Sequence, residues 1–287
     1  MRAAYIQKIE ALASSFPNRN VTLYFPDFEA PPASDNLNQV FGAPVGVKAE
    51  NWPTFPGLPA LLEQIGEELE DPRDLRMELI CQIDLRGLEG LGAPAEARVM
   101  QLYLSNAGFH EAWAPNTEHA RVVFLSHAEV AAGRFKGELP ARSQDRELRR
   151  FTLVPVAVPN EVFAVSPEDK DTPLGKLRKA IWAAPGRLGG EPIWLQGDPD
   201  ENEDYDGGGD DEEDGYAEGE DEDGDEDEGD EDEVNEKAAP ARGKSAPLGI
   251  SGGGGFYMQF DDGFADVNLG DSGVMYVFGS DAHFQCY

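Results

Sequence analysis

The sequence predicts an α+β fold that consists mainly of antiparallel sheet with a few helices. Short runs of aromatic and β-branched residues, which favour strands, alternate with clusters of Gly, Pro, Asn and Asp, which favour turns. Apolar residues recur at helical spacing in only three stretches, 3–16, 58–70 and 174–182. Two parts of the chain also match each other closely, which predicts an internal duplication within this fold.

Seven stretches have the composition of strands, in the order 21–25, 78–85, 99–105, 121–126, 151–158, 256–260 and 274–278. Pro26 is expected to end the first strand, and Pro155 to place its strand at a sheet edge or a bulge. The segment 29–56, rich in Pro, Gly and Asn, is predicted to be loop. The last two strands follow each other across turn residues, including 261–263, so we expect them to be antiparallel neighbours.

The predicted duplication depends on two matching strand pairs. Residues 78–85 align with 255–262, and 99–106 align with 274–281. The alignment places Gln82 and Asp84 opposite Gln259 and Asp261, and a Gly/Pro turn precedes each pair. We therefore expect two halves, about 40–106 and 188–287, that share one topology and one core. Chance similarity between short strand pairs is the alternative.

The formal net charge of −33 comes mostly from one tract. Residues 198–233 contain 24 Asp or Glu and no Lys or Arg, which leaves −9 for the rest of the chain. The segment 198–247 has almost no large apolar residue, so we predict a disordered insertion within a single domain formed by 1–197 and 248–287. This charge argues against nucleic acids and anionic membranes as partners, and favours a basic protein.

Several features bear on the location of the protein in the cell. The N-terminus has no uninterrupted apolar segment of a signal peptide, and no run of about 18 apolar residues predicts a transmembrane helix. Cys81 and Cys286 lie in apolar, strand-like surroundings, which favours buried reduced thiols over a disulfide. We expect a cytoplasmic protein. The sequence predicts nothing about its oligomeric state.

The candidate binding residues are the repeated polar pairs and their neighbours in turns. If the halves are related by pseudo-symmetry, a groove between them is expected to be lined by Trp52, Gln82, Asp84, Gln259, Asp261 and Asp271. Such a groove suits a peptide or protein segment. In the alternative, the amides satisfy buried backbone groups at strand ends, the aspartates shape turns, and the tryptophan packs on the core.

The sequence contains no strong catalytic or metal-binding signature. The four histidines, His110, His119, His127 and His283, lack the close spacing of a zinc site. No nucleophile elbow or phosphate-binding loop is found. We therefore predict no catalytic residue, no metal and no cofactor, and an interaction protein in preference to an enzyme. An enzyme or small-ligand binder that uses the groove is the alternative.

Five motifs stand out along the chain: the turn at 42–44, the segment 51–53, the strand end 81–85, the segment 189–196 and the C-terminal segment 268–278. Together they resemble the YwqG-like family of bacterial proteins, catalogued as domain of unknown function 1963. The resemblance covers about 40–287, with the acidic segment as an insertion. It implies a mixed α and β fold with an internal repeat and no established activity. By genomic association it also suggests an immunity or regulatory role toward a polymorphic toxin.

Overall fold

The computed structural model describes residues 2–30, 32–55, 57, 59, 63, 75–88, 90–105, 120–193, 255–267, 269, 273–279 and 281–285. The predicted helix at 58–70, the acidic insertion 198–247, Asp271 and Cys286 therefore lie wholly or almost wholly outside the described residues. Contacts divide the chain into one unit formed by Met1–Gln196 with Gly253–Tyr287 and a second formed by Gly197–Gly252. The first unit contains all the elements below.

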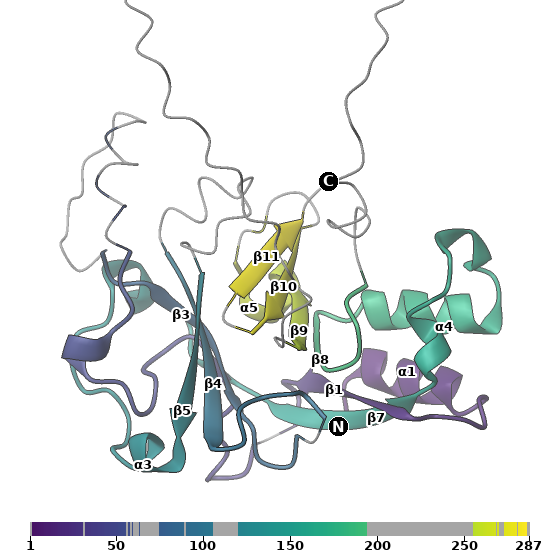
Figure 1. Cartoon of the computed structure of the whole chain (residues 1–287), viewed down its shortest axis with the longest axis horizontal. Helices are drawn as coiled ribbons and strands as arrows, with labels where there is room; N and C mark the ends of the chain where they lie inside the picture. The colour runs from purple at the N-terminus through teal and green to yellow at the C-terminus, as the bar shows by residue number, and fades with distance from the viewer. Residues whose placement is uncertain are drawn as a thin grey trace, which may run out of the picture. The chain divides into compact units, whose positions relative to one another are not determined.

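The first unit contains two antiparallel sheets, as the sequence predicts for an α+β protein (Figure 1). The six-stranded sheet has the order β11 (Asp281–Gln285), β10 (Val274–Phe278), β9 (Phe256–Asp261), β8 (Gly186–Leu188), β1 (Val21–Asp27) and β7 (Thr152–Val158). The five-stranded sheet has the order β5 (Ala120–Ser126), β4 (Ala97–Leu104), β3 (Glu78–Asp84), β2 (Gln39–Val40) and β6 (Arg149–Arg150).

Helices are few and mostly short. The α-helices are α1 (Ala4–Ala13), α3 (His127–Val130), α4 (Pro173–Trp182) and α5 (Asp262–Ala265). The 3₁₀ turns are η1 (Ala49–Asn51), η5 (Ala141–Gln144), η6 (Asn160–Val162) and η7 (Pro167–Asp169). Two of the three helices predicted from the sequence are thus present at α1 and α4, each a full ten residues long.

The six-stranded sheet lies between a helical layer and the five-stranded sheet. Alternate residues of β1 divide between two cores, because successive side chains of a strand point to opposite faces. Leu23 and Phe25 pack with Ile6 and Ile9 of α1, whereas Tyr24 belongs to the core shared with the other sheet. Figure 1 shows α1 and α4 together beside β1 and β7.

The core between the sheets joins residues that are far apart in the chain. The Sγ atom of Cys81 on β3 lies 3.9 Å from the Sδ atom of Met258 on β9. The chain also crosses from β6 to β7 through Phe151, whose side chain is fully buried. β5 and β11 are in contact as well. The two sheets are therefore one structural unit rather than separate domains.

The structure corrects three predicted boundaries. β1 continues through Pro26 to Asp27, because the Pro26 carbonyl accepts a hydrogen bond from the Tyr5 hydroxyl and points away from β7. The amide nitrogen of a strand residue points the same way as its carbonyl, so proline removes no bond from the β1–β7 ladder. The predicted turn at 261–263 includes the start of α5, and the predicted loop 29–56 includes β2 and η1.

Other strand predictions are confirmed. β9 and β10 are antiparallel neighbours, with Met275 opposite Phe260. β7 is an edge strand, so Pro155 lies where a sheet tolerates proline.

Gly190 provides a test of how tightly the turn after β8 is packed. A Cβ atom there would lie 2.5 Å from Phe163 Cζ and 2.8 Å from Leu23 Cδ2, at a φ of +75°. We expect G190A to lower the free energy of unfolding by about 1 kcal/mol through backbone strain and by about 1–3 kcal/mol more through overpacking. G87A is the matched control, since Gly87 has a φ of +72° with nothing within 4 Å of the added atom. Equal losses in urea unfolding would contradict the packing argument.

Candidate functional site

Two turns are fixed by polar side chains, among them Gln82 and Gln259, which the sequence singles out. The first follows β2, where Phe41 and Gly42 have φ values of 57° and 75°. Gln39, on β2, donates from Nε2 to the carbonyl oxygens of Phe41 at 2.7 Å and Ala43 at 3.1 Å. A left-handed turn points its carbonyls away from any sheet ladder, so the Gln39 side chain satisfies groups that would otherwise be unbonded.

The second turn follows β8 and has the same backbone conformation. Gly189 and Gly190 have φ values of 81° and 75°. Arg187 takes the place of glutamine and donates from Nη1 to the Gly189 carbonyl at 2.7 Å and from Nη2 to the Glu191 carbonyl. Side chains of different chemistry thus cap equivalent carbonyls in the two turns.

Gln82 and Gln259 bind the chain just beyond these turns. The Oε1 atom of Gln82 accepts the Val45 N–H at 2.9 Å, and that of Gln259 accepts the Ile193 N–H at 3.1 Å. Both N–H groups come directly after a proline of the turn. Exposure of Gln82 is 0% and of Gln259 5%, so both amides are internal and bonded to the backbone rather than open to solvent.

The strands next to β3 and β9 complete the two networks. Gln101, opposite Gln82, donates to the Val45 carbonyl at 2.9 Å, and Tyr276, opposite Gln259, donates to the Ile193 carbonyl at 3.0 Å. Each segment after a turn is therefore held through both its N–H and its C=O.

Arg187 is a charged residue of these networks, and the sequence analysis missed it together with Gln39, Gln101 and Tyr276. It is buried, and burial lowers its pKa to about 9, so the guanidinium keeps its charge at neutral pH. Its donors reach two carbonyls and Gln259 Oε1, and the rings of Phe163 and Phe256 lie 5.5 and 5.0 Å from its Cζ. The one signal in the sequence was its position two residues before the double glycine.

The structure places Trp52 in a packed aromatic cluster. Its exposure is 5%, and its Nε1 donates to the Met77 carbonyl at 2.9 Å. The rings of Tyr103 and Phe135 lie 5.9 and 4.8 Å from it. The indole therefore covers the end of the five-stranded sheet, which is the alternative that the sequence analysis left open.

Asp84 and Asp261, the aspartates of the predicted groove that lie among the described residues, have separate environments. Asp84, at the end of β3, forms ion pairs with Arg98 and with Arg86. Asp261, at the end of β9, caps α5 by accepting the Gly263 N–H at 2.9 Å. Within the described residues, no hydrogen bond or ion pair joins the β3 residues of the groove to those of β9.

Burial and, to a smaller extent, the neighbouring carboxylate of Asp262 raise the pKa of Asp261 to about 6. The backbone N–H groups that this carboxylate accepts act in the opposite direction. Asp261 therefore titrates well above the range of an ordinary aspartate.

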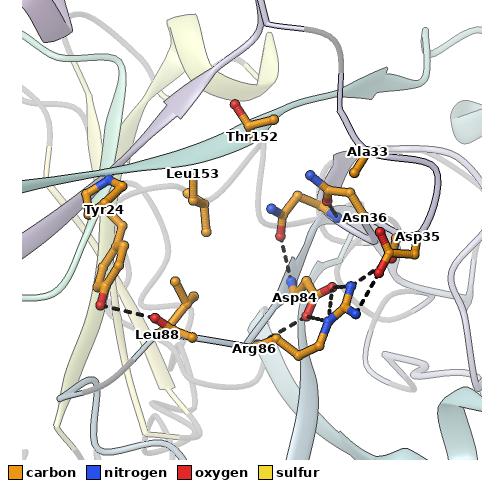
Figure 2. Close-up of a pocket in the computed structure, with 12 residues that line it drawn as sticks. Tyr24, Ala33, Asp35, Asn36, Asp84, Arg86, Leu88, Thr152 and Leu153 are labelled. Carbon is orange, nitrogen blue, oxygen red and sulfur yellow. Dashed lines mark hydrogen bonds and ion pairs between the residues drawn. The ribbon is translucent and has the colours of Figure 1, made fainter.

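A cavity of about 550 Å³ lies between the two sheets, and of the predicted site residues Asp84 alone lines it. One wall comes from β1 and β7 with Tyr24, Thr152, Leu153 and Pro155; the other comes from the segments around β2 and β3 with Asn36, Asn38, Asp84, Arg86 and Leu88. Figure 2 shows Tyr24 and Leu153 facing Leu88 across it, with the charged residues at the far end.

Arg86 organises the charged end of the cavity. Its Nη2 lies 2.8 Å from Asp84 Oδ2, and its Nη1 lies 2.7 Å from Asp35 Oδ2 (Figure 2). The hydrogen bond and charge of Arg86 lower the pKa of Asp35. The guanidinium thereby ties the loop before β2 to the end of β3.

Among the described residues, no three His, Cys, Asp or Glu side chains are grouped to hold a metal ion. His127 is exposed at the start of α3, and burial raises the pKa of the Cys81 thiol to about 12. In the same part of the chain, every helix is too short or too polar to cross a bilayer.

Comparison with known proteins does not place the chain in a family. No protein-family model matches it, and no curated protein matches it.

Substitution of the buried amides tests their structural role. We expect Q82L and Q259L each to lower the free energy of unfolding by about 2–3 kcal/mol, because each leaves a buried N–H without an acceptor. Q7L is the control, since the Gln7 amide bonds at an exposed position. Urea unfolding measures the effect, and unchanged stability in both variants would show that the amides are dispensable to the fold.

The raised pKa of Asp261 predicts a specific dependence of stability on pH. The folded-state pKa of about 6 exceeds the ordinary 3.8, so the contribution of this residue to stability falls as pH rises between these values. D261N keeps a capping oxygen but has no ionisable group at this position. We expect the stability of D261N to lack this decrease with pH, and the variant to be more stable than the unmodified protein at neutral pH. Urea unfolding at about pH 4.5 and about pH 7 tests this. D171N, at an exposed site, should leave the slope unchanged.

Proposed function

We propose that the chain is a non-enzymatic interaction protein whose partner is a basic protein. The observation that supports it best is the concentration of 24 acidic residues, without Lys or Arg, in residues 198–233. Such a charge density accelerates encounter with a basic surface and disfavours acidic competitors. The binding free energy is then strongly dependent on salt.

The folded unit supports this proposal in a second way. The polar residues repeated at 82, 84, 259 and 261 have internal partners, namely backbone groups, arginines and a helix end. Their observed contacts are those of structural residues.

We also infer that the two halves arose by duplication. The registers support this, since Asp84 pairs with Val99 as Asp261 pairs with Val274. Five strands in the same relative order support it further, with β5-β4-β3-β2-β6 corresponding to β11-β10-β9-β8-β1. The proposal has three further parts. They are membership of the YwqG-like family, a cytoplasmic location and immunity toward a basic toxin.

The second candidate function is binding of a small ligand between the two sheets. It is favoured by the cavity between the two sheets, whose volume falls within the range of about 300–1,000 Å³ typical of ligand sites. This function would not depend on the acidic tract.

An affinity experiment on the full chain tests the interaction proposal. The unmodified protein, a deletion of 198–233 and a variant with Asn and Gln at every acidic position of 198–233 are each used to capture partners from native lysate at low and high salt. We expect the unmodified protein to capture one basic protein at low salt and to release it at high salt. Neither variant should capture this protein. The amide variant is the matched control for tract length.

Capture of the same protein by all three forms would assign binding to the folded unit instead. Absence of a specific basic partner at low salt would refute the proposal. Competition with poly-lysine distinguishes a specific partner from general attraction to any polycation. A specific partner should bind to the chain in preference to poly-lysine.

A further inference from the structure

We propose that the cavity between the two sheets binds a small uncharged ligand that combines an apolar body with a hydrogen-bond acceptor, as an aromatic carboxamide does. The inference rests on the second candidate function above and is independent of the acidic tract. Three features of the walls carry it: their neutralised charge, one side-chain donor that the protein does not use, and an apolar surface.

The charged groups at the cavity neutralise each other. Asp84 and Asp35 both pair with Arg86, and Asp84 also pairs with Arg98. Two carboxylates therefore face two guanidinium groups, and the buried Asp84 is held by both cations. An ionised ligand beside the buried Asp84 would have to displace one of its partners or enter without a counter-charge, and either costs free energy.

Asn38 supplies a hydrogen-bond donor that the fold does not use. The residue is only 5% exposed, and its Oδ1 accepts the Asp84 N–H at 2.6 Å. Because a backbone N–H can only donate, this bond fixes the orientation of the amide and leaves Nδ2 at its other corner. Nδ2 bonds to no other group in the described part of the chain, although Asn38 lines the cavity.

Asn36 shows by contrast what a structural asparagine does here. Its Oδ1 accepts the Asn38 N–H at 2.7 Å, and its Nδ2 donates to the Phe151 carbonyl at 3.0 Å. Both ends of that amide are used. Within the described residues the Asn38 Nδ2 has no such partner, so it is available to an acceptor atom of a ligand in the cavity.

The rest of the cavity suits an apolar body. Leu88, Leu153, Pro155 and the Tyr24 ring form the walls beyond the charged end (Figure 2). The Tyr24 hydroxyl is directed to the Gly87 carbonyl at 3.4 Å. A flat ring between these walls, with its carbonyl toward Asn38, uses both parts of the site.

The test uses three probes of one shape and different charge: benzamide, benzoate and benzylammonium. They are titrated into the full chain labelled with ¹⁵N. We expect benzamide to bind with a Kd of about 1 mM, and each ion to bind about tenfold more weakly or not at all. The side-chain amide resonance of Asn38 should shift with benzamide, while that of Gln7, which lies outside the cavity, serves as the internal reference.

Two tryptophan variants locate the binding. L153W fills the cavity and should abolish the benzamide response, whereas L148W adds the same bulk at a surface residue that is 43% exposed and outside the cavity. Deletion of 198–233 and high salt should leave benzamide binding unchanged, which separates this result from that of the interaction proposal. The inference is overturned if benzamide does not bind, if L153W binds it normally, if either ion binds as well as benzamide, or if the Asn38 amide does not respond.

Discussion

The fold depends on buried glutamine amides that hold irregular backbone against a sheet. After β2 and after β8 the chain leaves its ladder through two consecutive left-handed residues, and its next free N–H has no strand partner. Gln82 and Gln259 provide the missing acceptor from the neighbouring strand. Because an unpaired buried N–H is costly, each turn and its glutamine are required together. The core between the sheets can close only over turns fixed in this way.

Charge is divided sharply along the chain. In the folded unit the buried charges have local roles: Arg187 caps a turn, and Arg86 and Arg98 neutralise Asp84 beside the cavity. In the tract 198–233 the carboxylates have no basic neighbours in sequence. Long-range electrostatics and short-range recognition are thereby assigned to different segments, which is why salt separates the two proposed binding activities.

The sequence predicted the longer elements well because hydrophobic periodicity is a local signal. The α1 and α4 helices and the central strands β3, β4, β5, β9 and β10 all lie within predicted segments or overlap them closely. It missed the five-residue β11 at the edge of the six-stranded sheet. It also missed β2, β6 and β8, which are two or three residues long and exist only because longer neighbours pair with them. Local composition cannot reveal such strands.

The candidate site was harder to predict for the same reason. Alignment of the two matching parts of the chain identified Gln82 and Gln259 as equivalent. It did not indicate whether their side chains face a ligand or the backbone. Asn38 and Arg86 became visible only when the fold brought the loop before β2 to the end of β3. The spacing of Asn38 and Arg86 in the sequence does not link them. The segments around β1, β7 and the end of β3 come together only in the folded chain.

The order of the strands along the chain also sets the order in which they leave the ribosome. β8 leaves the ribosome well before β9, and the acidic tract separates the two. During this interval Cys81 and the apolar face of β3 lack Met258 and the other β9 residues that cover them. A nascent chain with exposed apolar strands is prone to aggregate, whereas a dense block of like charge opposes association. The tract therefore emerges at the stage when the unfinished core most needs protection by charge repulsion.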